Sequence, residues 1–508
     1  MERVREPQGS VPASASGRSV GREASLAVSQ PLAQAVGQPW PPLLGAAGRK
    51  LALLFPEGSH RARHAPVLAI VLAYLAAIAA GALVLLLRQA GRPPWETLWA
   101  EDGSKLLPGA LRQPWGSIVQ QYAGYTQLVP RLIADCVAAL PLGDAAAGFA
   151  VAGALAASCC AAFTFRACAG HVDAPALRAV LAASVVLLPT ALIEIAGSGI
   201  DVPWYLLFAV FWALPWRPRS GAGMAVAGLI GLAAMSSQIL TALYAPLAAA
   251  RVIALPRARE QAVTFGLLAG AALQVPAILM AREPYHLSHP DRAGGFYLQH
   301  VILAAVAGRR TAAALQDAAG VLGAVVIAAC AVVLVAGWAF ARGGPRVRVF
   351  IVTAIGLGLL LAMFPAMVRA RVTLPGQVSA VWVPGGRYAT APILLIDAIV
   401  IVAADASLHQ GAVRRRPARP WPARPRRRRH LAAWALLLAL GASWAADFRY
   451  VNSRSSYPAW SQVVSRVRSR CRAHSAPTVW VPQIRAFLPC QDVHHGDPRR
   501  RPGQSQRL

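Results

Sequence analysis

Two acidic residues, Glu101 and Asp102, stand side by side in a stretch that also contains several large aromatic side chains. The stretch reads TLWAEDGSKLLPGALRQPWGSIVQQYAGYTQLVPR and runs from residue 97 to residue 131. Carboxylates in this setting can be solvated loop residues, can cap a helix, or can accept a proton in a reaction. Large aromatic side chains suit the level of lipid headgroups, where they can hold a lipid or a sugar. Those of this stretch are Trp99, Trp115, Tyr122 and Tyr125.

Another acidic candidate, Glu194, lies near the end of an apolar run, and Asp201 follows it in a short loop. The segment reads ALIEIAGSGIDVPWYL, residues 191–206. Ionisable groups at membrane depth are costly and are therefore candidates for function. Glu194 could bind a substrate or pair with an arginine on the same side of the membrane, and structural pairing alone is the alternative.

A third segment, REPYHLSHPDRAGGFYLQH at 282–300, places His286, His289 and Asp291 at a spacing that metal ligands can have. Pro284 and Pro290 flank these residues, so a helix that would fix the geometry of the ligands is not expected. We therefore favour contact with a substrate or with the surface over a metal site in this segment.

The composition places all of these residues in a membrane protein. The chain of 508 residues is 56% hydrophobic, has a mean hydropathy of +0.47 and contains only 14% charged residues, against roughly 25% in a soluble protein. We predict an all-α polytopic membrane protein with about eleven transmembrane helices, because about eleven apolar runs approach the roughly 20 residues that cross a bilayer. Only the sequence SSQ at 236–238 divides 221–253 into two spans. The runs lie near 65–87, 145–168, 177–195, 202–216, 221–235, 238–253, 260–281, 313–341, 349–368, 389–405 and 431–446.

The net charge of +29 does not indicate a nucleic-acid partner. Of the 50 basic residues only Lys50 and Lys105 are lysines, and the arginines are dispersed among short loops between apolar runs. A nucleic-acid site needs a continuous basic face with aromatic platforms, which this pattern lacks. The bias towards arginine, alanine, glycine and proline suggests a GC-rich bacterial genome, and the expected location is the bacterial plasma membrane.

The arginines also predict the orientation of the chain. The segment 411–430 contains nine of them and is expected in the cytoplasm. Counting spans back from it predicts a disordered cytoplasmic tail at 1–64, a transmembrane domain at 65–446 and a first outer loop at 89–131. The remaining segment, 447–508, is then an extracytoplasmic tail although it carries eleven arginines. If 431–446 does not span, that tail is cytoplasmic instead.

Two cysteines in this last segment, Cys471 and Cys490, bear on the same question. They lie about twenty residues apart in a small segment that is expected outside the cell, where disulfides form and persist. We predict a disulfide between them, worth roughly 3 kcal/mol in the chain-entropy account. Two unpaired thiols are the alternative. A disulfide would favour the outward orientation of the tail.

Three short motifs resemble those of the type C (GT-C) glycosyltransferases, which are multi-span enzymes that use sugars linked to a lipid phosphate. The motifs are WAEDG at 99–103, YAGYTQLVPR at 122–131 and GGRY at 385–388, and the resemblance covers most of residues 65–460. It implies an acidic first outer loop followed by an interfacial helix. It also implies a polyprenyl-phosphate-sugar donor and a glycan or lipid acceptor of the cell envelope, on the extracytoplasmic face.

The resemblance assigns a role to each candidate. Asp102 is the first choice for the general base by its position in the motif, and Glu101 is the alternative, because adjacent residues point in different directions. The other acid could hold a divalent cation, Mg²⁺ or Mn²⁺, or orient an arginine; the metal requirement stays open. Arg387 and Arg131 are candidates to bind the leaving phosphate, although both could instead extend to lipid headgroups. Arg369 and Arg371 are weaker candidates for the phosphate. The substrate-binding candidates are Tyr388, Glu194, Tyr122 and Tyr125.

Other functions remain to be weighed against this one. The sequence contains neither a phosphate-binding loop of the Walker type nor a dinucleotide fingerprint, so the energy for transfer would come from an activated lipid donor. A transporter or lipid flippase predicts internal repeats and charges near the bilayer midplane. No clear repeat is present, and Asp135 and Asp397 are the nearest such charges, both expected close to span ends. A non-enzymatic protein of envelope assembly is the third alternative.

Overall fold

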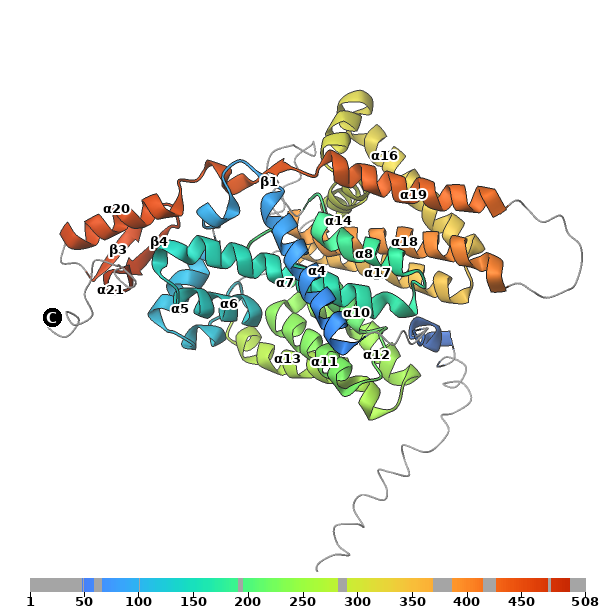
Figure 1. Ribbon diagram of the computed structural model, residues 1–508, viewed down its shortest axis with the longest axis horizontal. Helices are drawn as coiled ribbons and strands as arrows, with labels where there is room; N and C mark the ends of the chain where they lie inside the picture. The colour runs from blue at the N-terminus through green and yellow to red at the C-terminus, as the bar shows by residue number, and fades with distance from the viewer. Residues whose placement is uncertain are drawn as a thin grey trace, which may run out of the picture. The chain divides into compact units, whose positions relative to one another are not determined.

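The structure is a computed structural model that describes residues 48, 50–58, 66–99, 101–190, 195–281, 290–368, 386–413, 426–473 and 477–493. Most of the predicted tail 1–64 and the central part of the arginine-rich segment, 414–425, therefore lie outside the described residues. Within residues 51–508 the chain is mostly helical, with two short two-stranded sheets among the described residues (Figure 1).

Six of the described helices are long and apolar enough to cross a membrane, which makes the chain a multi-pass membrane protein. They are α4 (Val67–Leu87), α7 (Ala145–Ala167), α13 (Ala262–Leu279), α16 (Arg310–Arg342), α17 (Pro345–Val368) and α18 (Thr390–Val413). The predicted count of about eleven spans is not established, because the other apolar runs form helical segments of 10–17 residues. These include α8 (Pro175–Leu187), α10 (Val202–Ala213), α11 (Gly221–Ser237), α12 (Ala245–Ala254) and the apolar part of α19 (Arg426–Ala446).

The break that the sequence SSQ predicted is present. Helix α11 ends at Ser237, and a short 3-10 helix (Ile239–Tyr244) leads into α12. Gln238 between them is extended, and its side chain accepts a hydrogen bond from the backbone N–H of Leu240. Helices α11 and α13 approach closely through glycines, since a Cβ at Gly231 would lie 2.5 Å from the carbonyl oxygen of Val263. Small residues allow such backbone contact between membrane helices.

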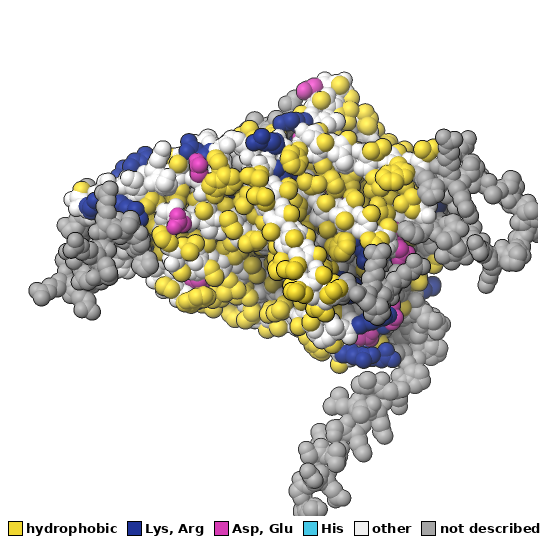
Figure 2. All heavy atoms as spheres, viewed as in Figure 1, with side chains coloured by type: hydrophobic (Ala, Val, Ile, Leu, Met, Phe, Trp, Pro, Cys, Tyr) yellow, Lys and Arg dark blue, Asp and Glu magenta, His cyan; other side chains and the backbone are white. Residues whose placement is uncertain are grey.

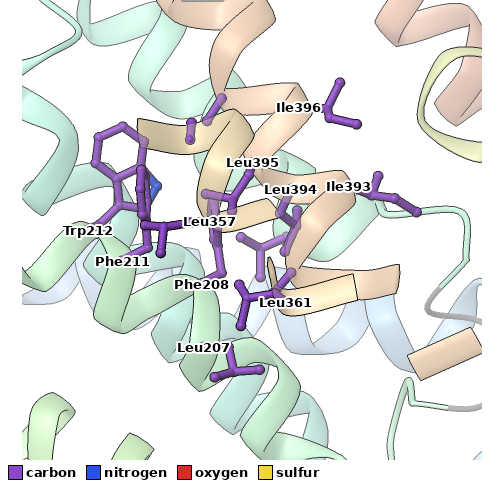
Figure 3. Close-up of a cluster of buried hydrophobic side chains, with 14 of the residues drawn as sticks. Leu207, Phe208, Phe211, Trp212, Leu357, Leu361, Ile393, Leu394, Leu395 and Ile396 are labelled. Carbon is purple, nitrogen blue, oxygen red and sulfur yellow. The ribbon is translucent and has the colours of Figure 1, made fainter. Parts of the chain in front are cut away.

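The central core forms where α10 lies against α17 and α18. Every residue of α10 is buried, so this short helix has no face left for solvent or lipid. Its ring of Trp212 stacks on Phe350 of α17 with centroids 5.5 Å apart, and Phe211 meets Trp212 edge to face at 5.2 Å. Figure 3 shows the aliphatic side chains of α17 and α18 that complete this cluster, including Leu357, Leu361, Leu394 and Leu395.

A second core joins the predicted first outer loop to the end of the chain. The loop contains a π-helical turn (Asp102–Leu106), α5 (Leu107–Arg112) and, after it, α6 (Leu128–Ala138). The end of the chain contains α20 (Trp460–Ala473), the hairpin of β3 (Thr478–Val481) and β4 (Ala486–Pro489), and α21 (Cys490–Val493). These elements lie together at the left of Figure 1. Their shared core contains Trp99, Leu106, Leu107, Trp460, Val464, Ile484 and Leu488.

The predicted disulfide is present in this second core region. Cys471 at the end of α20 is bonded to Cys490 at the start of α21, with the two Cα atoms 5.6 Å apart. The described part of 447–508 is therefore a folded segment that packs on the first outer loop. Trp460 anchors it by donating a 2.7 Å hydrogen bond from its indole N–H to the carbonyl oxygen of Leu142.

The segment after α19 is also tied to the end of α4. Strand β1 (Gln89–Ala90) pairs in parallel with β2 (Tyr450–Val451). The buried Arg88 donates hydrogen bonds to the carbonyl oxygens of Val186 and Phe448, at 2.6 and 3.1 Å. The end of α4 and the segment after α19 therefore meet beside the first outer loop.

Candidate functional site

A cavity of about 380 Å³ lies where six segments of the chain meet. Its walls come from a tight turn at residues 122–125, the first turn of α10, the break after α11, the last turns of α13 and α17, and the start of α18. The polar and aromatic side chains that line it are Tyr122, Tyr125, Gln127, Asp201, Trp204, Gln238, Arg387 and Tyr388. Four of these, Tyr122, Tyr125, Arg387 and Tyr388, are among the candidates that the sequence indicated.

Arg387 is the central charge of the cavity. Its Nη1 lies 3.1 Å from Oε1 of Glu101 and 3.7 Å from Oδ1 of Asp201. The side chains of Arg387 and Glu101 are each 20% exposed, whereas that of Asp201 is 1% exposed. One guanidinium therefore faces two carboxylates, and one of those carboxylates lines the cavity. Glu101 does not line the cavity itself but holds Arg387 from outside its wall.

Asp102 points elsewhere. Its side chain is fully buried, and its two oxygens accept hydrogen bonds from the backbone N–H groups of Gly199 and Ile200, at 3.1 and 2.8 Å. Burial raises the pKa of the Asp102 carboxyl to about 6, even though these two donors and the nearby Arg454 guanidinium lower it. Asp102 therefore supports the turn that delivers Asp201, and it is not one of the residues that line the cavity. The role of general base that the sequence suggested for Asp102 stays a prediction.

A second buried arginine, Arg454, comes from the segment between α19 and α20. It donates hydrogen bonds to the carbonyl oxygens of Ala196 and Gly197, and its guanidinium lies 5.6 Å from the ring centroid of Trp99. Burial lowers the pKa of Arg454 to about 10, and the charges of Asp102 and Asp201 oppose that shift. The folded end of the chain thus contributes a positive charge directly to the acidic cluster.

The turn before Asp201 is built from residues that local rules favour there. Gly197 has a φ of +65°, which is accessible to glycine at little cost. A Cβ at Gly199 would lie 2.7 Å from the Phe149 ring, so a larger residue does not fit. Asp201 precedes α10 and Pro203 lies in its first turn, a common start for a helix. This GSGIDVP signal could have singled out Asp201, which the sequence placed in a loop but did not assign to the site.

The aromatic wall is held in place by several contacts. Trp204 meets Tyr388 edge to face with ring centroids 5.1 Å apart. The turn between Tyr122 and Tyr125 closes as a β-bridge. The Gln274 side chain fixes this turn on α13, because it accepts from the Thr126 N–H at 2.8 Å and donates to the Thr126 carbonyl at 3.2 Å. Amides, hydroxyls and aromatic rings therefore line the cavity together with the charged residues.

Apolar side chains also line the cavity. Ile278 of α13 and Phe364 and Val368 of α17 line it, and both helices are candidate membrane spans. Ile278 is 42% exposed and Phe364 is 45% exposed, so the rim reaches the outer surface of the helices. A ligand with a polar head and an apolar tail would match this mixed lining.

The remaining sequence candidates lie outside the cavity. Arg131 is 3% exposed and donates a 3.3 Å hydrogen bond to the carbonyl oxygen of Lys105, so it neither lines the cavity nor extends to headgroups. Asp397 is buried near the middle of the span Gly386–Leu408, not at a span end as expected. The other candidates, which lie outside the described residues, are Glu194, His286, His289, Arg369 and Arg371.

The described residues contain no group of three His, Cys, Asp or Glu side chains that could hold a metal ion. Asp291 belongs to the described backbone without a described side chain, so the histidine segment is not tested.

Comparison of the chain with protein-family models, with curated proteins and with solved structures finds no match. The fold and the site together define a mostly helical, multi-pass membrane protein with a charged and aromatic cavity.

Proposed function

We propose that this cavity is the active site of a membrane glycosyltransferase of type C. The enzyme would transfer a sugar from a polyprenyl-phosphate donor to a glycan or lipid acceptor of the bacterial cell envelope. The observation that carries the proposal is the position of Arg387, which faces Glu101 and Asp201 at a cavity that is also lined by apolar side chains of two candidate membrane-spanning helices. An amphipathic substrate would bring its phosphate to the arginine and keep its chain at the apolar rim.

The chemistry assigns one task to each charged residue. The acceptor hydroxyl attacks the anomeric carbon, the bond from that carbon to the phosphate oxygen breaks, and the hydroxyl proton passes to a carboxylate. Asp201 is this carboxylate in the proposal, because it lines the cavity. Arg387 pairs with the departing phosphate through its planar guanidinium. Glu101 holds Arg387 in position through their ion pair. Glu101 itself does not occupy the cavity.

The uncharged wall suits a sugar. The rings of Trp204 and Tyr388 offer apolar faces to the C–H side of a pyranose, and their polar edges can form hydrogen bonds. The amides of Gln127 and Gln238 add donors and acceptors for sugar hydroxyls. A few placed polar groups in a mostly apolar cavity are typical of small-molecule sites.

Two independent rules support an extracytoplasmic location of the site. Disulfides persist in oxidising compartments, and the Cys471–Cys490 disulfide lies in the segment that packs on the first outer loop. Helix α18 begins at the cavity, and the arginine-rich segment 411–430 follows at its far end. The positive-inside rule places that segment in the cytoplasm. In the proposal the N-terminus is cytoplasmic as well, since α4 ends at Arg88 on the side of the site.

The proposal is tested by reconstituting the full chain into liposomes with synthetic polyprenyl-phosphate sugars and measuring the labelled sugar in glycan or lipid products. Transfer that requires Arg387 is the expected result. Uptake of a solute or flipping of the lipid without any sugar transfer would contradict the proposal and favour a transporter. Comparison of envelope glycolipids in cells with and without the gene would then name the sugar and the acceptor.

A further inference from the structure

A separate groove of about 500 Å³ lies between α4, α7 and α8, away from the cavity of the candidate site. Small side chains form most of its wall, including Ala77, Ala80, Gly81, Ala161, Ala162 and Ala183. Helix α4, which crosses the front of Figure 1, forms one side, and only Ala82 and Leu85 of this helix are buried. Figure 2 shows hydrophobic side chains over the same face. A groove on the exposed surface of a membrane span is in contact with lipid chains.

A buried hydroxyl in this groove has no partner. Ser158 of α7 lines the groove and is 2% exposed, and its Oγ forms no hydrogen bond among the described residues. Other helical hydroxyls here donate to the carbonyl four residues earlier, as Thr164 does to Cys160 at 2.8 Å. Ser158 instead faces Gly81, where an added Cβ would lie 2.9 Å from its Oγ. An acceptor inside the groove would satisfy this otherwise unpaired donor.

The end of the groove at Tyr74 is positively charged. The ring of Phe165, which lines this end, lies edge to face with Tyr74 at 6.4 Å. The Arg178 guanidinium lies 5.6 Å from the Phe165 centroid, and its Nε is buried without a hydrogen-bond partner. Arg178 donates one hydrogen bond, to the carbonyl oxygen of Asp173 at 3.3 Å. The charges of Arg166 and Arg178 both act on the Tyr74 hydroxyl.

We propose that this groove is a binding site for a glycerophospholipid with an anionic headgroup. The acyl chain lies along the alanine and glycine wall, and the phosphate lies at the end with Arg166 and Arg178. Ser158 lies two helical turns from Arg166, roughly 12 Å along α7. The long arginine side chain and the glycerol and ester groups below the phosphate together cover this distance. The Ser158 hydroxyl donates to an ester carbonyl. Basic pockets between transmembrane helices bind anionic lipid headgroups by the same physics.

The first test fills the groove. The purified full chain is titrated with phosphatidylglycerol and with phosphatidylcholine of the same acyl chains, and bound lipid is counted by native mass spectrometry. Ala77→Phe places a ring in the groove and is expected to remove most of the bound lipid. Ala76→Phe is the matched control, because Ala76 is the preceding residue of α4, is exposed and does not line the groove. If Ala77→Phe does not fold, Ala183→Leu fills the groove from α8.

The second test separates the headgroup from the chain. Arg178→Gln is expected to weaken phosphatidylglycerol binding by about fivefold and phosphatidylcholine binding by clearly less, because choline balances the phosphate charge of the latter. The control is Arg342→Gln, since Arg342 also lies over an aromatic ring, that of Trp338, at a helix end. Ser158→Ala is expected to weaken both lipids equally, because both carry ester carbonyls.

Three results would overturn the proposal. Equal lipid binding by Ala77→Phe and Ala76→Phe would show that the groove is not the site. An equal loss of both lipids in Arg178→Gln would show that the arginine does not distinguish the two headgroups. Displacement of bound lipid by dodecaprenyl phosphate but not by excess phosphatidylglycerol would assign the groove to an isoprenoid chain instead. None of these results depends on sugar transfer, so the proposal stands or fails separately from the proposed function.

Discussion

Arg387 and Glu101 are 286 residues apart in the chain, yet Nη1 of the arginine lies 3.1 Å from Oε1 of the glutamate. The same Nη1 lies 3.7 Å from Asp201, so the start of α18, the first outer loop and the start of α10 meet at one charge. An arginine that faces two carboxylates has its orientation defined from two sides. In the proposal, an arriving phosphate would compete with those carboxylates for the guanidinium. Arg387 is therefore the first residue to replace in a test of the proposed function.

We predict that Arg387→Gln lowers the rate of sugar transfer by about 100-fold, the loss seen when one electrostatic donor to a developing negative charge is removed. The protein should remain in the membrane at normal levels, because Arg387 is partly exposed. Transfer from a labelled polyprenyl-phosphate sugar in proteoliposomes measures this. Arg112→Gln, at an exposed arginine of the same outer loop, is the matched control and should transfer at the normal rate.

Asp201→Asn should lower transfer by about 100-fold as well, because the amide cannot accept the acceptor's proton. Glu101→Gln should have a smaller effect, since Glu101 acts through Arg387 in the proposal. The ratio of the two losses distinguishes the roles. A larger loss for Glu101→Gln than for Asp201→Asn would assign the proton transfer to Glu101 and contradict our choice.

Asp102→Asn should behave differently from both, as a change in stability. Burial raises the pKa of the Asp102 carboxyl from 3.8 to about 6. Because the folded protein then binds this proton more tightly than the unfolded chain, the resulting stabilisation is complete below pH 3.8 and is lost as the pH rises through about 6. The full effect corresponds to about 3 kcal/mol. The melting temperature of the wild type should therefore fall, relative to Asp102→Asn, between pH 4 and pH 7.

The measurement is a thermal melt of the detergent-purified protein at several pH values, with Asp144→Asn at an exposed acid as the control. The control should follow the wild type at every pH. A melting temperature for Asp102→Asn that runs parallel to the wild type across this range would show that Asp102 does not titrate as its burial indicates. Such a result would question the position of Asp102 outside the cavity.

Much of the architecture could be predicted from the sequence because it follows from local composition. Long apolar runs became long helices, and the SSQ break and the Cys471–Cys490 pair each depend on residues close in the chain. The count of spans could not be predicted in the same way. Runs such as 202–216 form helices shorter than a bilayer needs, and nothing in their composition distinguishes them from true spans.

The types of residue that form the candidate site could be predicted from the sequence. The directions in which their side chains point could be predicted less well. Tyr122, Tyr125 and Tyr388 line the cavity, but which of two adjacent acids faces Arg387 depends on the backbone of one π-helical turn. Arg454 was not singled out, because it is one of eleven arginines in residues 447–508 and no local motif marks it among them. Contacts between distant segments leave no trace in hydrophobic periodicity.

Arg454 leads to a fourth prediction. Arg454→Gln removes a buried cation beside Asp102 and Asp201, and uncompensated buried charges cost about 3–5 kcal/mol. We expect a large fall in melting temperature and partial recovery in the double variant Arg454→Gln with Asp102→Asn. The exposed Arg449→Gln is the control and should melt like the wild type. Additive losses in the double variant, measured by the same thermal melts, would mean that the two side chains are not coupled.

The fifth prediction concerns the side of the membrane on which the site lies. Gln113 is exposed in the first outer loop, and Arg259 is exposed before α13, at the end of that helix away from the cavity. In a background without the exposed cysteines 136, 159 and 330, a membrane-impermeant maleimide should label Gln113→Cys in intact cells. Arg259→Cys should react only after the membrane is opened. The reason is that α13 is long and apolar enough to place its two ends on opposite sides.

The disulfide provides an internal standard for this experiment. If Gln113→Cys faces the oxidising side, Cys471 and Cys490 should be resistant to a thiol reagent until the protein is reduced, because they lie on the same side as the loop. Labelling of Arg259→Cys alone in intact cells would place the cavity in the cytoplasm. A cytoplasmic site would face nucleotide sugars and a reducing solution, and neither the disulfide nor a lipid-phosphate donor on the outer face would then be consistent with the structure.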